Sequence, residues 1–239
     1  MTTSSTSEAT TTYPAFSAND EVLARVRANL ARVHQRIRSS GRDPESVRVV
    51  AVTKSFSTPE VRAALNLGLF TLGENYVDEL CEKRRATADP RARWHYLGAL
   101  QTNKIARALE CADVVCAVSR ERELDRIATL SPSAPVYVQV DFTDAVGRRG
   151  VAPGAVGALV TRARELGLEV RGVMVVAPRS AEAAREAFGR TCTLADEWGI
   201  AERSMGMSDD LEMACELGST EVRLGRALFG SRVSVGRLA

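Results

Sequence analysis

Short apolar segments alternate with segments of helical periodicity along almost the whole chain. The expected strands lie near residues 47–54, 69–73, 94–98, 113–118, 135–142, 168–176, 203–207 and 220–224. The expected helices lie between them, at residues 58–67, 75–87, 102–110, 120–130, 154–166, 180–198 and 209–217. Such alternation predicts parallel strands, because each strand is joined to the next through a helix. Nearly continuous apolar strands, such as the one from Val136 to Val140, are typical of a sheet that helices cover.

Eight strands alternating with helices predict a (β/α)8 TIM barrel of the α/β class. The chain has 239 residues, close to the ~250 that are usual for this fold. A doubly wound open sheet is the alternative, but no G-x-G-x-x-G pattern follows any expected strand. Because no linker-like stretch interrupts the pattern, residues 18–239 are expected to form a single domain.

An additional helix is expected before the first strand. Its apolar residues recur at steps of four and three and form one stripe: Val22, Val26, Leu30, Val33 and Ile37. Asn19 or Asp20 can cap its start, and Gly41 ends it. We expect this helix to cover one end of the barrel.

The composition excludes several classes of protein. The net charge is +2, and basic residues occur in short pairs such as Arg84-Arg85 and not in dense runs, so no nucleic-acid partner is expected. No apolar segment approaches the ~20 residues that cross a bilayer. Residues 1–17 begin with a Thr- and Ser-rich stretch that lacks the features of a secretory signal, and we expect a disordered tail. Without such a signal we expect a cytoplasmic protein, and a barrel of this size is expected to be a monomer.

The cysteines do not suggest a disulfide framework or a metal site. The five of them, at positions 81, 111, 116, 192 and 215, are an odd number and include no C-x-x-C spacing. We therefore expect reduced thiols, with Cys111 and Cys116 on either side of a core strand. Since His34 and His95 are the only histidines, no zinc site is expected.

Lys54 is the candidate reactive residue. It closes the first apolar strand, and a helix start follows at Ser57-Thr58-Pro59. Functional groups of this barrel lie at the carboxyl ends of the strands. An ammonium group at the mouth of a buried strand must find an anion or lose its proton, and a neutral lysine can form a Schiff base with an aldehyde.

The segments after strands 7 and 8 are suited to an anion. Gly206 and Gly225 permit close backbone approach, and Ser208 supplies a hydroxyl. A helix is expected after each of the two turns, and its N-terminal amides and dipole favour a phosphate. Ser208 is also a good N-cap for the helix at 209–217, and the two roles are compatible. Asp209 and Asp210 would repel a phosphate, so they must point away from it if this is the phosphate loop.

Arg223 is expected inside the barrel. Strand alternation places Val222 and Leu224 toward the helices and Arg223 on the opposite face with Glu221. A buried guanidinium needs a partner, which is a ligand or, alternatively, Glu221 or another interior acid. After strand 2, Asn75 contacts a ligand or caps a helix.

An amine, a phosphate site and an interior arginine together fit an aldehyde that carries a phosphate. Pyridoxal 5′-phosphate (PLP) is the leading candidate, and a sugar-phosphate aldehyde is the second. An arginine beside the pyridine nitrogen of PLP keeps that nitrogen unprotonated, which makes the ring a weaker electron sink than one paired with a carboxylate.

Five segments resemble the pyridoxal phosphate homeostasis proteins. They are Val50-Ala-Val-Thr-Lys54, Phe70-Thr-Leu-Gly-Glu-Asn-Tyr-Val77, Trp94-His-Tyr-Leu-Gly-Ala-Leu-Gln101 with Asn103-Lys104, Met205-Gly-Met-Ser-Asp-Asp-Leu-Glu212, and Gly218-Ser-Thr-Glu-Val-Arg-Leu-Gly225 with Phe229-Gly230. The resemblance implies a barrel similar to the N-terminal domain of alanine racemases, with PLP bound covalently to Lys54. By the same resemblance the other cofactor-binding residues are Asn75, Met207, Ser208, Arg223, Gly225 and Arg226, with Arg223 at the pyridine nitrogen.

Two positions depart from the family pattern. Many members have threonine where this chain has Arg226, so a hydroxyl contact to phosphate is lost while the backbone amide remains. The segment Gly147-Arg148-Arg149-Gly150 stands where a lysine-containing loop is more usual.

The resemblance implies a carrier more than a catalyst. Alanine racemases use a tyrosine base from a second domain, which this sequence is not expected to contain. We expect a PLP-binding protein that stores or delivers the cofactor, with PLP-dependent apo-enzymes as candidate recipients, and that influences amino-acid pools. The alternatives are a racemase or other PLP enzyme, with Tyr76, His95 or Tyr137 as its base, and a Schiff-base aldolase for sugar phosphates.

Overall fold

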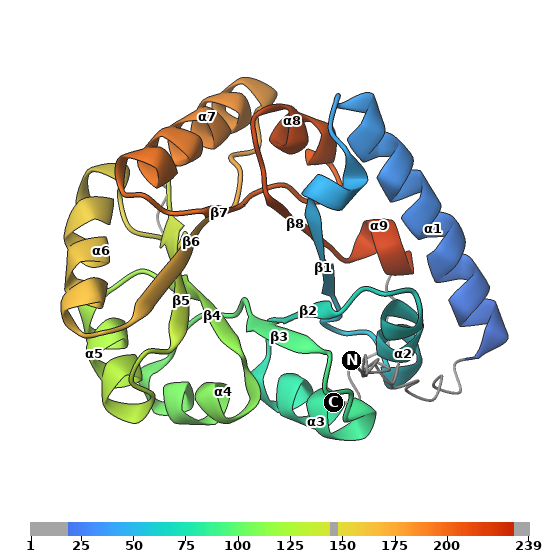
Figure 1. The fold of residues 1–239 in the computed structure, drawn as a ribbon, viewed down its shortest axis with the longest axis horizontal. Helices are drawn as coiled ribbons and strands as arrows, with labels where there is room; N and C mark the ends of the chain where they lie inside the picture. The colour runs from blue at the N-terminus through green and yellow to red at the C-terminus, as the bar shows by residue number, and fades with distance from the viewer. Residues whose placement is uncertain (1–18, 144–147, 232–239) are drawn as a thin grey trace, which may run out of the picture.

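The computed structural model describes residues 19–143 and 148–231, which form a closed parallel barrel (Figure 1). Its strands are β1 (Arg48–Val52), β2 (Thr71–Glu74), β3 (Arg93–Tyr96), β4 (Val114–Val118), β5 (Pro135–Val140), β6 (Glu169–Val175), β7 (Glu202–Ser204) and β8 (Glu221–Leu224). They pair in chain order, and β8 closes the ring on β1. The predicted (β/α)8 barrel is confirmed. The predicted tail at residues 1–17 lies outside the described residues.

Helices surround the barrel and bury their apolar faces against it. They are α1 (Asp20–Ser39), α2 (Thr58–Asn66), α3 (Val77–Thr87), α4 (Ile105–Cys111), α5 (Glu121–Leu130), α6 (Val156–Glu165), α7 (Ala181–Glu197), α8 (Leu211–Glu216) and α9 (Arg226–Phe229), with 3-10 turns η1 (Pro44–Ser46), η2 (Thr102–Lys104) and η3 (Pro153–Ala155). In the described ranges, none of them has the length and apolar character to cross a membrane. The helix expected after the eighth strand is α9, although its four residues are too few to show periodicity.

Strand alternation divides the side chains between two environments. Val222 and Leu224 of β8 belong to the main core between strands and helices. Arg223 lies inside the barrel, as predicted, where it donates to oxygens of β6 and β7. Part of the interior is filled by the ring of Tyr137, and a Cβ at Gly172 on β6 would lie only 2.6 Å from that ring.

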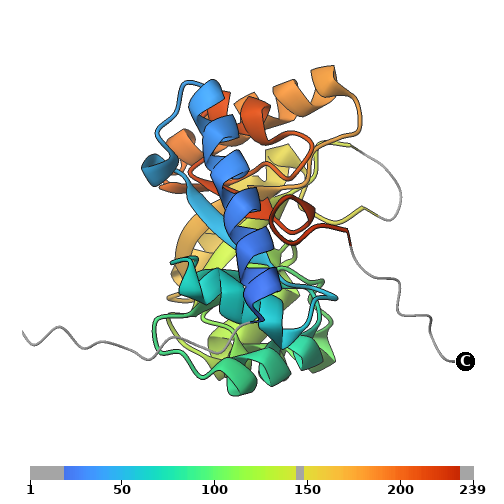
Figure 2. The same ribbon diagram turned by 90° about the vertical axis from the view of Figure 1, so that its right-hand side faces the viewer.

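The position of α1 differs from the prediction. It does not cover an end of the barrel but lies along the outer ring, against α2, α8 and α9 (Figures 1 and 2). The predicted apolar stripe of α1 is buried in the main core on that side of the ring. Asn29 of α1 donates to the carbonyl of Leu228 at 2.8 Å, and Arg36 donates to both carboxylate oxygens of Glu212 at 2.5 and 2.6 Å.

The prediction that all cysteines are reduced thiols is wrong for two of them. Cys81 of α3 and Cys111 of α4 form a disulfide, with 5.2 Å between their Cα atoms. Cys111 ends a helix and does not begin a core strand, whereas Cys116 lies within β4 as expected. A separation of 30 residues gives no sign in the sequence that two neighbouring helices of the ring bring these thiols together. Cys116, Cys192 and Cys215 are free.

Candidate functional site

A cavity of about 720 Å³ lies at the carboxyl ends of the strands. Its lining includes all seven residues that the sequence singled out: Lys54, Asn75, Met207, Ser208, Arg223, Gly225 and Arg226. These residues come from four different βα units, so only the closed barrel brings them together. Their contact with a ligand remains a prediction.

Lys54 is the lysine that faces this cavity. The chain has three lysines, Lys54, Lys83 and Lys104. Lys83 is buried and donates to the carbonyl of Thr53 and to two carboxylates, and Lys104 is exposed in η2. Of the three, only Lys54 lines the cavity. A Schiff base formed there therefore has one candidate amine.

Ser208 joins the two loops that were expected to bind phosphate. Its hydroxyl oxygen accepts the backbone N–H of Ala227, in the first turn of α9, at 3.1 Å. The prediction that Ser208 also caps the following helix is wrong, because α8 begins at Leu211 with Asp210 in the N-cap position. The loop turns at Gly206, which has φ +98° and where a Cβ would lie 2.5 Å from the Cβ of Ala214.

The two aspartates of this loop are both engaged. Asp210 accepts the N–H of Met207 at 2.5 Å, which folds its carboxylate back onto the loop. Asp209 forms an ion pair with Arg226, and its side chain is 85% exposed. Arg226, the residue that departs from the family pattern, thus offsets a negative charge beside the expected phosphate position.

Arg223 is held inside the barrel by neutral oxygens. Its guanidinium donates to the carbonyl of Ser204 at 2.6 Å, to the hydroxyl of Ser204 at 2.9 Å and to the carbonyl of Val175 at 2.7 Å. Burial lowers the pKa of Arg223 from its ordinary value. The alternative of a direct ion pair with Glu221 is not what the described residues show. A guanidinium has five N–H donors, so donors remain for a ligand in the cavity.

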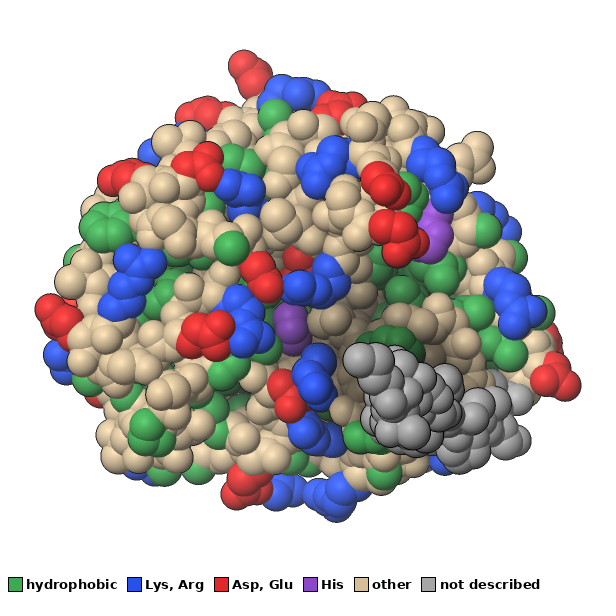
Figure 3. All heavy atoms as spheres, viewed as in Figure 1, with side chains coloured by type: hydrophobic (Ala, Val, Ile, Leu, Met, Phe, Trp, Pro, Cys, Tyr) green, Lys and Arg blue, Asp and Glu red, His purple; other side chains and the backbone are tan. Residues whose placement is uncertain are grey.

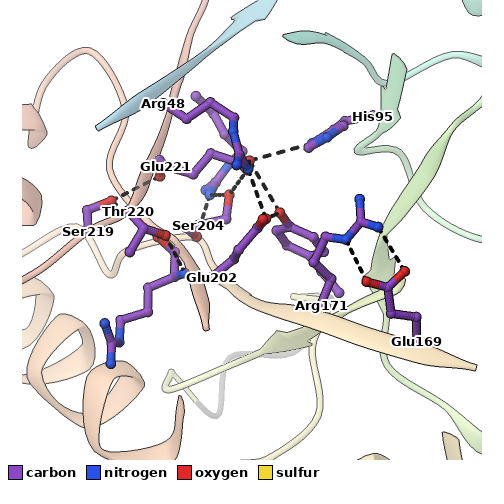
Figure 4. Close-up of polar contacts among 12 residues, drawn as sticks. Arg48, His95, Glu169, Arg171, Glu202, Ser204, Ser219, Thr220 and Glu221 are labelled. Carbon is purple, nitrogen blue, oxygen red and sulfur yellow. Dashed lines mark hydrogen bonds and ion pairs between the residues drawn. The ribbon is translucent and has the colours of Figure 1, made fainter. Parts of the chain in front are cut away.

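Glu221 supports Arg223 through Ser204, whose hydroxyl contacts both side chains. The Ser204 hydroxyl donates to Glu221 at 2.7 Å (Figure 4), and Arg48 and Tyr137 each donate to the other Glu221 oxygen at 3.3 Å. Tyr137 also donates to Glu202, whose pKa is raised chiefly by burial. Figure 3 shows acidic and basic side chains mixed around the middle of the barrel in this view.

His95 belongs to this interior cluster and not to the cavity. Its ring packs edge-on against Tyr137, with 5.8 Å between ring centres, and its Nδ1 lies 3.8 Å from Glu221. Burial lowers the pKa of His95. It is a packed histidine, and the residues described contain no cluster of His, Cys, Asp and Glu suited to a metal ion.

Asn75 reaches the cavity because two close contacts fix its backbone. Its N–H donates to the buried carboxylate of Glu74 at 3.0 Å. A Cβ at Gly98 would lie 2.0 Å from the Asn75 carbonyl oxygen, so the segment after β3 approaches it through a glycine. The alternative of a helix cap is wrong, because Tyr76 occupies the N-cap position of α3.

The cavity also contains residues that the sequence analysis did not propose as cofactor-binding. They include Phe56, Leu97, Gln139, Arg149, Met174 and Val176. Gln139 was detectable, because it is a polar residue within an otherwise apolar strand, and it donates to the carbonyl of Arg149 at 2.7 Å. That bond brings the Arg148-Arg149 segment to the cavity, which sequence periodicity could not show.

Known proteins are similar to this chain in sequence and in fold. A model of the alanine racemase N-terminal domain matches residues 22–233. A pyridoxal phosphate homeostasis protein from Pseudomonas aeruginosa is 36% identical over 223 residues, covering 88% of this chain and 97% of the relative. One from Deinococcus radiodurans is 37% identical over 209 residues, covering 85% and 99%. The chain belongs to the pyridoxal phosphate homeostasis protein family. The resemblance seen in its sequence motifs is confirmed.

Solved structures agree with this placement. PipY of Synechococcus elongatus, solved with PLP bound, is 31% identical, with a TM-score of 0.70 over 83% of this chain and all of PipY. An alanine racemase from Corynebacterium glutamicum has the same TM-score at 15% identity. This chain covers 63% of that racemase, and the likeness there concerns the barrel fold alone.

Proposed function

We propose that this protein binds PLP in the cavity, carries it reversibly on Lys54 and so contributes to PLP homeostasis. The observation that carries the proposal is the position of Lys54, the one lysine of three at a cavity that also contains Ser208, Gly225 and Arg223. The names of the relatives and the PLP bound to PipY support the choice of ligand. PLP-dependent apo-enzymes are the candidate recipients.

The residues fit the parts of PLP. PLP supplies an aldehyde, and the Lys54 amine condenses with it to form a C=N bond with loss of one water. The same bond is opened by water or by another amine, which makes the attachment reversible. The loops after β7 and β8 offer a hydroxyl and backbone amides to the phosphate, beside Arg226.

Arg223 determines how weakly the ring accepts electrons. A guanidinium donates hydrogen bonds and accepts none, so a ring nitrogen facing it is an acceptor and stays unprotonated. Such a ring stabilises a carbanion less well than one held by a carboxylate. Proton removal from a bound amino acid is therefore expected to be slow.

The cavity also offers little for proton transfer. Among its described lining residues, Asp209 is the sole carboxylate, and it pairs with Arg226. The three candidate bases, Tyr76, His95 and Tyr137, do not line it. This arrangement supports a carrier over a racemase.

The first test locates the attachment. Purified protein is incubated with PLP, reduced with borohydride and digested, and the adduct is mapped by mass spectrometry. We expect a single adduct on Lys54, lost in Lys54→Ala and kept in the control Lys104→Ala. An adduct on Lys83 or Lys104, or none, would overturn the proposal.

The second test separates carrier from enzyme and from aldolase. The PLP-loaded protein is incubated with L-alanine and L-serine in D2O, and α-proton exchange is followed by NMR. We expect negligible exchange, and exchange at rates typical of enzymes would establish the racemase alternative. A visible absorbance band of the PLP-loaded protein that is lost on borohydride reduction would exclude the aldolase alternative.

A further inference from the structure

The backbone on both sides of Lys54 is held by one helix. Ser55 has φ 61°, a left-handed conformation that non-glycine residues keep only where their surroundings impose it. Its N–H donates to the carboxylate of Glu79 at 3.0 Å. On the other side of Lys54, the carbonyl of Thr53 accepts from the amine of Lys83 at 2.7 Å. Glu79 and Lys83 are one turn apart on α3 and contact each other at 2.8 Å.

The helix that provides these contacts is itself well anchored. Lys83 is 6% exposed and donates at 2.6 Å to Glu74, which also accepts from the hydroxyl of Thr53 at 2.9 Å. Burial raises the pKa of Glu74, with the nearby lysine acting in the opposite direction. Cys81, between the two residues of the pair, is bonded to α4. The pair therefore has a fixed base from which to hold the Lys54 turn.

We propose that Glu79 and Lys83 are positioning residues that hold the Lys54 amine in the orientation needed to capture and retain PLP. The proposal rests on the function proposed above and deepens it, because it assigns a role to residues that do not line the cavity. The two contacts go to the peptide groups immediately before and after Lys54. Loss of either one loosens the turn at Lys54, which then keeps the hydrogen bond from the Phe56 N–H to the Thr53 carbonyl at 2.9 Å. Since retention of PLP depends on that orientation, PLP should dissociate faster when the contact from Glu79 or Lys83 is removed.

Glu79 is the better of the two residues to test. Its side chain is 33% exposed, so removing it leaves no deeply buried cavity. Glu79→Ala removes the acceptor of the Ser55 N–H. Glu79→Gln keeps an acceptor oxygen, and since one Glu79 oxygen accepts from both Ser55 and Lys83, a single carbonyl oxygen is enough. Glu186→Ala, which breaks the i,i+4 pair with Arg190 on α7, is the matched control.

The first readout needs no PLP. Hydrogen–deuterium exchange of the unloaded protein should show faster exchange at the Ser55 amide in Glu79→Ala, and rates close to wild type in Glu79→Gln and Glu186→Ala. The second readout is the rate of PLP loss on dilution. We expect Glu79→Ala to lose PLP about five times faster, equivalent to about 1 kcal/mol, and Glu79→Gln to restore most of the difference.

The outcomes distinguish this proposal from the proposed function. If the wild-type protein does not retain PLP, the proposed function fails, while hydrogen–deuterium exchange at the Ser55 amide still reports on its hydrogen bond to Glu79. If wild type retains PLP and Glu79→Ala retains it equally well, the positioning role is refuted. Lys83 is tested by comparing Glu74→Gln/Lys83→Met, which leaves no unpaired buried charge, with Glu74→Gln alone, because Glu74 also accepts the N–H of Asn75. Faster PLP loss from the double variant than from Glu74→Gln supports the proposal, and equal loss contradicts it.

Discussion

Gly206→Ala tests whether the loop after β7 depends on a glycine. Gly206 has φ +98°, and a Cβ there would lie 2.5 Å from the Cβ of Ala214. Two other glycines separate the contributions. Gly41 has φ +78° with nothing within 4 Å of its Cβ position, and Gly154 has neither a positive φ nor a neighbour within 4 Å.

The expected effects follow from these geometries. A positive φ costs alanine about 1–2 kcal/mol, and the clash in the core adds about 1–3 kcal/mol. Every Gly→Ala change also restricts the unfolded chain, which stabilises the folded state by about 0.4–1 kcal/mol. We therefore expect a loss of about 3 kcal/mol for Gly206→Ala and about 1 kcal/mol for Gly41→Ala. Gly154→Ala should be neutral or slightly stabilising.

Urea unfolding measures these differences, provided that the dependence on denaturant is the same in all variants. PLP retention gives a second reading, because Gly206 directly precedes Met207 and Ser208. Gly206→Ala should weaken retention, and Gly41→Ala should not. A stability loss for Gly206→Ala no larger than that for Gly41→Ala would refute the argument from the Ala214 contact.

Two further predictions concern charged residues. Arg223→Gln removes the guanidinium that donates to the carbonyls of Ser204 and Val175, and it also removes a buried charge, which partly offsets that loss. We expect the free energy of unfolding to fall by about 2 kcal/mol and PLP to be released faster. Unchanged PLP release with a collapse in stability would make Arg223 purely structural. The hydrogen bond from Arg36 lowers the pKa of Glu212, so this pair stabilises the folded state at neutral pH and stops doing so as the pH falls through the folded-state pKa. Urea titrations at several pH values measure the free energy of unfolding, which should fall less on acidification in Arg36→Ala than in the wild type. The difference should be no more than about 1 kcal/mol, because both side chains are about one-third exposed.

The barrel was predictable because its signal is repeated eight times. Each apolar strand is weak evidence alone, but alternation with helices along the chain admits few topologies. The features that were not predicted correctly are those that leave no repeating hydrophobic pattern in the sequence. The disulfide depends on the packing of α3 against α4, and the place of α1 depends on its contacts with α2, α8 and α9.

The candidate site was predictable for a different reason. Because barrels concentrate function at the carboxyl ends of strands, Lys54, Ser208 and Gly225 could be selected by position alone. Arg223 followed from strand alternation. Its partners did not, because the expectation was a ligand or an interior acid, whereas neutral oxygens of β6 and β7 hold Arg223.

The supporting contacts lie behind the cavity and not within it. Lys54 is held through its backbone by α3, and Arg223 through Ser204 by the cluster around Glu221. The groups capable of moving protons, such as Tyr137 and Glu202, are occupied in that cluster. A racemase that uses two bases would need one of them on the cavity side, opposite Lys54. For the carrier proposed above, what matters is orientation, and the contacts behind the cavity supply it by fixing Lys54 and Arg223.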